Sequence, residues 1–323
     1  MSKQHVDGPT RWDYLALDPQ AKRLYVTHVD QVDIFDTVAK SMVGHIPGTH
    51  GVHGVALAPS LDRGFTSNGR DSTVTVFALS SSAVLATVPT EKNPDAVVFD
   101  PASNRVFAAN GGSNSLTAID AITNHQIRSI ALGGRPEFAA VDGKGRLFIN
   151  LEDKNSLVVV DTEALTITHR YDLSAACDEP AGLSIDAKRP VLFVGCHNRK
   201  MAIVDANTGK IIDVVPIGAG SDATAFDDVT EKAFSSNGDG TPTVVAAGKN
   251  GHYAVLQDVV TMRGARTMAV DPISHAVYLV AAEVDHADSP TAGNSRPRPV
   301  LKPDSMTLIT VILEVAPPLI STH

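Results

Sequence analysis

The sequence predicts an all-β fold, a single seven-bladed β-propeller built from four-stranded antiparallel blades. The first observation is a unit that recurs seven times, about 40–44 residues apart, and is first met as "LDPQAKRLYVTHV" at 17–29. The second is that Val, Ile, Leu and Phe form short runs separated by Gly, Asn, Asp and Pro, as in strands joined by turns. Because four short strands make one blade and seven blades close a ring, we expect one domain over residues 1–323.

Each repeat unit orders its strands in the same way. A turn containing Asp follows the innermost strand, an aromatic residue marks the second strand, and a third strand such as "VDIFD" at 32–36 follows. The aromatic positions are Tyr25, Phe65, Phe107, Phe148, Phe193, Phe234 and Tyr278. The blades are expected to start near residues 13, 53, 95, 137, 181, 222 and 266. The turn aspartates are expected to be structural, because Asp pre-forms such turns: Asp18, Asp100, Asp120, Asp161, Asp205 and Asp271.

Composition and charge exclude several classes of protein. With 43% hydrophobic residues among 323, the chain can bury a large core. A net charge of −9 argues against a surface for duplex nucleic acid or an anionic membrane. No apolar run approaches the roughly 20 residues of a spanning helix, so no membrane insertion is expected. The polar start "MSKQHVDGPTRWD" has no signal core, which predicts a cytoplasmic protein if Met1 is the native start.

Several stretches resemble a known family. The sequence "LYVTHVD" at 24–30, followed by "VDIFD", is similar to the signature of the YVTN β-propeller repeat family, with His28 where that signature has Asn. Longer stretches, such as "GVHGVALAPSLDRGFTSNGRDSTVTVF" at 51–77, resemble the YncE-like bacterial group. The resemblance covers almost the whole chain and implies a seven-bladed propeller, commonly one exported to the periplasm. It implies little about chemistry, because propellers carry many unrelated functions.

One face of the predicted ring gathers the polar residues that carry chemistry. The loops entering the innermost strands and the tips after the second strands open on this face. The residues just before the innermost strands are mostly ionisable and point at the central channel: Asp13, His53, Asp95, Glu137, Ala181, Asp222 and Arg266. Blade five lacks a charge at Ala181 but has Glu179 two residues earlier. The tips add His28, Asn68, Asn110, Asn150, Cys196, His197 and Asn237.

These residues allow two interpretations, one structural and one functional. Asn at a tip is more often a turn residue than a ligand, and a histidine in such a place can be purely structural. His28 stands where other blades place Asn, so the turn does not require it. The functional interpretation puts a divalent metal ion among His28, His53, Glu137, Glu179 and His197, lining one pocket. Imidazole with carboxylates suits zinc, iron, manganese or nickel, and a calcium site of oxygen ligands is a further alternative. The remaining ligand-binding candidates are Asp13, Asn68, Asp95, Asn110, Asn150, Asp222, Asn237 and Arg266.

Two hypotheses about function stay open. The first, slightly favoured, is a non-catalytic propeller that binds a small-molecule ligand or a protein partner at the channel mouth. The second is a metal-dependent hydrolase or lyase for a small polar substrate, in which the metal activates water and His53 or Glu137 moves protons. No nucleophile elbow, phosphate loop or dinucleotide motif is present to favour another class.

Two further features bear on the same face. A long insertion at 285–305 in blade seven is either a plain loop or a lid that brings Arg296 or Arg298 to an anionic ligand. Cys177 and Cys196 lie in two loops of one blade on this face, close enough for a disulfide. The periplasmic location implied by the resemblance favours that bridge. In a cytoplasmic protein the two thiols would stay reduced, as metal ligands or as inert side chains.

Overall fold

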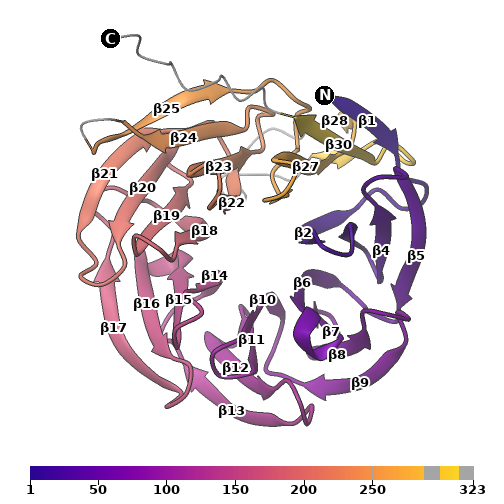
Figure 1. Ribbon diagram of the computed structural model, residues 1–323, viewed down its shortest axis with the longest axis horizontal. Helices are drawn as coiled ribbons and strands as arrows, with labels where there is room; N and C mark the ends of the chain where they lie inside the picture. The colour runs from indigo at the N-terminus through magenta and orange to yellow at the C-terminus, as the bar shows by residue number, and fades with distance from the viewer. Residues whose placement is uncertain (249–250, 287–298, 313–323) are drawn as a thin grey trace, which may run out of the picture.

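The computed structural model describes residues 1–248, 251–286 and 299–312 and confirms the predicted fold, a ring of seven four-stranded antiparallel sheets (Figure 1). Blades one to six each use four consecutive strands, with the first strand innermost. Blades one to three contain β2 Trp12–Asp18, β3 Arg23–His28, β4 Gln31–Asp36, β5 Ser41–Pro47, β6 Val52–Ala58, β7 Arg63–Asn68, β8 Thr73–Ala78, β9 Val84–Pro89, β10 Pro94–Asp100, β11 Arg105–Asn110, β12 Ser115–Asp120 and β13 Gln126–Ala131. Blades four to six contain β14 Pro136–Val141, β15 Arg146–Leu151, β16 Ser156–Asp161, β17 Thr166–Asp172, β18 Pro180–Asp186, β19 Val191–Cys196, β20 Lys200–Asp205, β21 Ile211–Pro216, β22 Ser221–Asp227, β23 Lys232–Asn237, β24 Thr243–Ala247 and β25 Tyr253–Asp258.

The seventh blade is assembled from both ends of the chain. Its strands, from the channel outward, are β26 Met268–Val270, β27 Ala276–Ala281, β30 Thr307–Ile312 and β1 Ser2–His5. The N-terminal strand β1 pairs antiparallel with β30, with Ser2 opposite Thr310. The sequence left open which terminus closes this blade, and in the structure the N-terminal strand supplies its outer edge.

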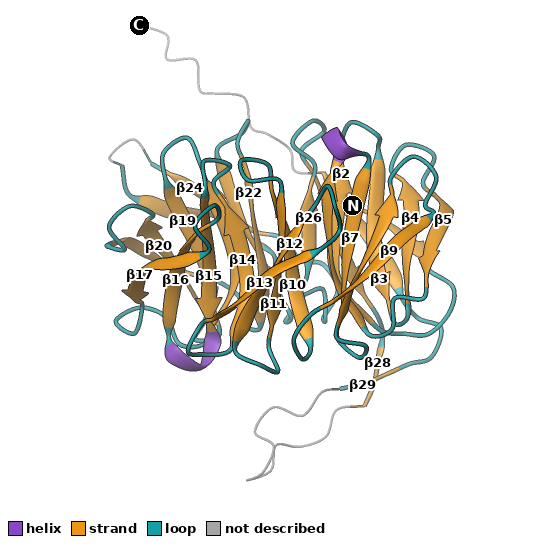
Figure 2. Cartoon of the chain, turned by 90° about the horizontal axis from the view of Figure 1, so that it is seen from below, coloured by secondary structure: helices purple, strands orange, loops and turns teal. Residues whose placement is uncertain are grey.

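A short hairpin stands out from the ring at the predicted insertion. Strands β28 Val284–His286 and β29 Val300–Leu301 pair with each other and extend beyond the face that carries the 3-10 turn η2, Glu152–Lys154 (Figure 2). The other 3-10 turn, η1 Pro59–Leu61, follows an innermost strand and therefore lies on the opposite face. Residues 287–298, with Arg296 and Arg298, lie outside the described residues.

The core lies between neighbouring blades, where the repeat aromatics are buried. All seven are 6% exposed or less: Tyr25, Phe65, Phe107, Phe148, Phe193, Phe234 and Tyr278. Val6, Trp12 and Leu24 pack in one apolar cluster with Leu308 and Tyr278, which joins the first blade to the last. The ring is therefore closed by burial of apolar surface as well as by strand pairing.

The turn aspartates are structural, as predicted. Oδ1 of Asp18 accepts hydrogen bonds from the backbone amides of Gln20 and Ala21, at 3.1 and 2.9 Å. Oδ1 of Asp120 does the same for the amides two and three residues further on. These bonds pre-form the turns on the face opposite the polar one.

Candidate functional site

A β-bulge near the start of six innermost strands falls on the column of mostly ionisable residues predicted to face the channel. In blades one to six the pairing with the second strand shifts just after the strand begins, as between Trp12 and Leu15 or between Pro94 and Val97. A bulge leaves one residue outside the ladder and turns its side chain, which is why bulges gather next to functional sites. The bulged positions carry Asp13, His53, Asp95, Glu137, Ala181 and Asp222.

Three of these side chains converge at the channel mouth. Nδ1 of His53 donates to Oδ2 of Asp13 at 2.6 Å and lies 3.8 Å from Oδ1 of Asp95. Gly69 leaves room for this imidazole, because a Cβ there would lie 2.7 Å from Nε2 of His53. The donor atoms of Asp13, His53 and Asp95 all lie within 4.8 Å of one another, a spacing that suits a shared cation.

Arg266 supplies the positive charge of this ring. Its Nε donates to Oδ2 of Asp222 at 2.6 Å, and a terminal guanidinium nitrogen lies 3.6 Å from Oδ1 of Asp13. Asp95 and Glu137 have no such arginine contact among the described residues. The channel mouth therefore holds four carboxyl groups against one guanidinium and one imidazole.

The excess of carboxyl groups shifts their proton affinities. Burial, with the charges of Asp13 and Asp222, raises the pKa of Asp95 to about 7, although His53 and Arg266 pull it down. Oδ1 of Asp95 is buried and has no hydrogen-bond partner among the described residues. Burial lowers the pKa of His53, but its bond to Asp13 and the charge of Asp95 outweigh this, so the pKa lies above its usual value. With burial and the neighbouring carboxyl groups acting together, the pKa values of Asp95 and His53 therefore both lie above their usual values.

An aromatic pair bridges the channel next to these charges. The rings of Tyr14 in blade one and Phe138 in blade four meet edge to face, with their centroids 5.0 Å apart. Burial raises the pKa of Tyr14 well above its usual value, and the charges of Glu137 and Asp95 add to that effect. Burial and the charge of Asp95 likewise raise the pKa of Glu137. The aromatic pair thus lies within the field of the carboxyl ring.

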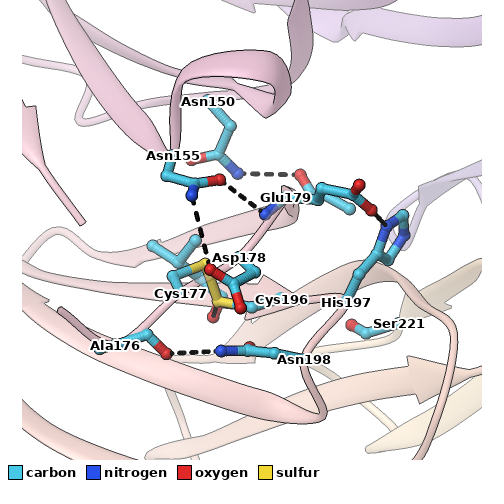
Figure 3. The surroundings of a disulfide bond; sticks show 12 residues. Asn150, Asn155, Ala176, Cys177, Asp178, Glu179, Cys196, His197, Asn198 and Ser221 are labelled. Atoms are coloured by element: carbon cyan, nitrogen blue, oxygen red, sulfur yellow. Dashed lines mark hydrogen bonds and ion pairs between the residues drawn. A yellow bond between two sulfur atoms is a disulfide. The ribbon is translucent and has the colours of Figure 1, made fainter. Parts of the chain in front are cut away.

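A second polar cluster lies on the rim of the same face, between blades four and five. His197 donates from Nδ1 to Oε2 of Glu179 at 2.9 Å (Figure 3). The same Nδ1 lies 4.0 Å from Oε1 of Glu152. Cys177 and Cys196 form a disulfide, with their Cα atoms 5.4 Å apart, which confirms the bridged alternative. Both sulfurs are thereby removed from the candidate metal ligands.

His28 belongs to neither cluster. It is 3% exposed, and its Nδ1 lies 2.6 Å from Oδ2 of Asp33 while its Nε2 donates to the carbonyl oxygen of Pro9. Burial lowers its pKa, but the bonds to Asp33 and Pro9 outweigh this and raise it above the usual value. Because both ring nitrogens are engaged with oxygen atoms of Asp33 and Pro9, His28 has no nitrogen left for a metal ion. It instead braces its hairpin and holds the N-terminal segment.

Three of the four tip asparagines brace their own hairpins. Asn68 donates to Oγ1 of Thr75 at 2.8 Å, and Asn110 donates to Oγ1 of Thr117 at 2.9 Å. Asn237 bonds within its own hairpin, whereas Asn150 donates to the carbonyl oxygen of Ala181 in the next blade. All four asparagines are 1% exposed or less, so the structure places them inside the sheets.

Three residues of these clusters were not predicted from the sequence. Tyr14 directly follows Asp13, and Phe138 directly follows Glu137. An aromatic residue next to an ionisable channel residue was the sequence signal that could have identified them. Glu152 starts the tip of blade four, where only Asn150 was considered. Other blades have Gly after the tip Asn, whereas blade four has the acidic pair Glu152 and Asp153 in its tip. This difference was the sequence signal for Glu152.

The fold and the polar face together define a seven-bladed propeller with a charged channel mouth. Residues 70–287 match the PQQ_2 family, described as outer membrane protein assembly factor BamB, and the chain belongs to this family. No curated protein matches the sequence. Within the described residues, no helix is long and apolar enough to cross a membrane.

Solved structures share the fold at low sequence identity. Kuenenia stuttgartiensis hydrazine synthase is 13% identical, with a TM-score of 0.74 over 85% of this chain and 94% of that one. The structure of U3-55K is 8% identical, with a TM-score of 0.77 over 96% and 98%. A chain of the mitotic checkpoint complex is 14% identical, with a TM-score of 0.72 over 85% and 89%. At these identities the likeness concerns the fold alone.

Proposed function

We propose that the protein is a non-catalytic binding propeller that takes up a small cationic ligand at its channel mouth. The carrying observation is the cluster of Asp13, His53 and Asp95, whose donor atoms lie within 4.8 Å of one another. A divalent metal ion is the simplest such ligand, since imidazole and carboxylate together suit zinc, manganese, iron or nickel. Asp222 and Arg266 neutralise each other beside the cluster, so Asp95 and Glu137 are the carboxyl groups of the ring that no arginine pairs with among the described residues.

The ligand competes with protons for this cluster. Asp95, with a pKa of about 7, is largely protonated at pH 6 and largely ionised at pH 8. We therefore expect Mn²⁺ to bind roughly tenfold more tightly at pH 8 than at pH 6, as measured by isothermal titration calorimetry. We expect Asp95→Asn to weaken binding and to reduce this pH dependence, with the remainder coming from the proton that His53 has to release. Equal affinity at both pH values would contradict the proposal.

The thermal stability of Asp95→Asn shows whether weaker binding comes from the loss of a ligand or from unfolding. A carboxyl group whose pKa is raised by folding lowers the stability of the folded protein as pH rises. The loss begins near pH 4, the pKa of Asp in the unfolded chain. For Asp95 this cost accumulates up to about pH 7, so Asp95→Asn is expected to unfold at a higher temperature than the wild type at pH 8. His169→Gln is the matched control, because His169 is exposed on the outer strand β17, away from the channel mouth. It should change neither affinity nor its pH dependence.

A second candidate is a metal-dependent hydrolase or lyase acting at the same place. The observation in its favour is the 2.6 Å bond from His53 to Asp13, which orients an imidazole for proton transfer. Glu137, with its raised pKa, is the second proton-carrying group there. This candidate requires hydrolysis of p-nitrophenyl acetate in the presence of Mn²⁺ that disappears in His53→Gln. If the wild type does not hydrolyse the ester, or if His53→Gln hydrolyses it equally fast, the enzyme hypothesis is wrong and the binding function remains.

We also place the protein in the periplasm, as an exported propeller like those of the YVTN family. The disulfide supports this, because such bonds persist in oxidising compartments. The family described as outer membrane protein assembly factor BamB supports the same compartment and a protein partner. That partner would bind beside the small-molecule site, since the channel mouth itself is lined by charged groups.

A further inference from the structure

The rim between blades four and five holds a cavity that the channel-mouth proposal does not use. It has a volume of about 510 Å³. Its lining is Glu152, Asp153, Asn155, Asp178, Glu179, His197 and Asn198. None of these residues is Lys or Arg, so the cavity gathers four carboxyl groups and one imidazole without a cation in its wall.

Three side chains in this wall have the spacing of metal ligands. Nδ1 of His197 lies 2.9 Å from Oε2 of Glu179 and 4.0 Å from Oε1 of Glu152. All three donor atoms lie within 4.8 Å of one another. Donors held about 2.1 Å from a tetrahedral ion are about 3.4 Å apart, which falls between the two observed distances. An ion would replace the proton that His197 shares with Glu179, without moving the backbone.

A buried oxygen in the same wall has no partner. Asn198 lines the cavity, and its side-chain nitrogen donates to the carbonyl oxygen of Ala176 at 3.1 Å. Its Oδ1 is buried and accepts no hydrogen bond from the described residues. A buried acceptor without a donor is costly, and a cation is one way to satisfy it.

The three ligands are held in place by covalent and hydrogen bonds. Cys177 lies two residues before Glu179, and Cys196 directly precedes His197, so the disulfide ties the two ligand loops together (Figure 3). The backbone amide of Glu179 donates to Oδ1 of Asn155 at 2.9 Å. Glu152 is fixed by an ion pair with Arg135, outside the cavity. Such support from neighbouring groups is what a preorganised metal site requires.

The residue type at position 179 sets blade five apart, because its backbone conformation is shared with other blades. Glu179 has φ +51°, in the left-handed region that favours Gly and Asn. The corresponding positions of four other blades also have positive φ and are Gly51, Asn93, Gly220 and Gly264. Glu179 therefore brings a carboxylate to a turn position that Gly or Asn holds in those four blades.

We propose that this cavity is a divalent metal site in which Glu152, Glu179 and His197 bind the ion and the Cys177–Cys196 disulfide presets their geometry. The imidazole ligand favours Zn²⁺ and similar transition ions over Ca²⁺, which takes six to eight oxygens. The site is independent of the channel mouth, because it shares no ligand with Asp13, His53 and Asp95.

Titration of the protein with Zn²⁺ tests this site, with Asp95→Asn as a background in which the channel mouth has lost one of its three ligands. We expect one Zn²⁺ per chain. Changing a group that merely supports a ligand costs about 10–100-fold in affinity, so His197→Gln and Glu152→Gln should each weaken binding at least about a hundredfold. His50→Gln is the matched control, since His50 pairs with Asp71 at 2.8 Å without a third ligand, and it should change nothing.

Three outcomes would contradict the zinc site. Unchanged Zn²⁺ affinity in His197→Gln, an equal loss in His50→Gln, or Ca²⁺ binding as tight as Zn²⁺ would each mean a solvated acidic patch and no site. Cys177→Ala/Cys196→Ala tests the positioning role and should weaken Zn²⁺ binding roughly tenfold while keeping the stoichiometry. Full affinity in that variant would remove the disulfide from the proposal. Because every arm uses the Asp95→Asn background, this site and the channel mouth can fail separately.

Discussion

His28→Ala is expected to lower the free energy of unfolding by about 3–5 kcal/mol, since it leaves a buried carboxylate without its partner. The side chains of His28 and Asp33 are only 2% and 1% exposed, and their bond is 2.6 Å long. Chemical denaturation at pH 6 measures the loss. The variant should keep its Mn²⁺ and Zn²⁺ affinities at temperatures where it is folded, because His28 lies in neither cluster.

The repeat itself supplies the control for this change. His28 and Asp33 occupy the register that Asn68 and Thr75 occupy in blade two, and those two residues bond to each other at 2.8 Å. The double variant His28→Asn/Asp33→Thr transplants that neutral pair and should recover most of the lost stability. A double variant as unstable as His28→Ala would show that the pair is not what stabilises this hairpin.

The same pair gives a pH dependence of known sign. Folding raises the pKa of His28, so its contribution to stability is fully present below the unfolded value near 6.5. It is lost as pH rises through the folded pKa. The difference in unfolding free energy between wild type and the double variant should therefore shrink as pH rises above 6.5.

Removing the disulfide is the second large effect. Cys177→Ala/Cys196→Ala should cost roughly 3 kcal/mol, because the bridge closes a loop with a sequence separation of 19. Alanine is the proper replacement, since both cysteines are fully buried in an apolar cluster. The denaturation midpoint of the oxidised wild type against the variant measures this.

A control separates the bridge from the loss of buried sulfur atoms. The single variant Cys196→Ala also removes the bridge and should lose nearly as much stability as the double variant. A wild-type midpoint that stays unchanged when a dithiol reductant is added would contradict the expectation. An unchanged midpoint would mean that the bridge does not reduce the conformational entropy of the denatured chain.

The ring could be predicted because each blade repeats the same local pattern. An aromatic residue at each second strand, from Tyr25 to Tyr278, has to be buried between blades, and that requirement is visible in sequence. Strand β1 could not be assigned, since "SKQH" is short and polar and its partner Thr310 is at the other end of the chain. Its pairing depends on ring closure and not on local propensity.

The polar face could be predicted only in outline. The column of ionisable residues follows from repeat register, and the structure brings Asp13, His53 and Asp95 together as neighbours across three blades. The contact of Tyr14 with Phe138 spans the channel, so no local pattern reports it. The role of His28 depends on Asp33 and on the carbonyl group of Pro9, which the alignment of repeats does not compare.

The most direct test of the channel-mouth proposal is anomalous diffraction from crystals of the protein grown with Mn²⁺ above pH 7. We expect a peak between Asp13, His53 and Asp95, with the side chain of Asp95 within bonding distance of the ion. A peak found only at the Glu152, Glu179 and His197 cavity, or none at either cluster, would contradict a cation-binding channel mouth.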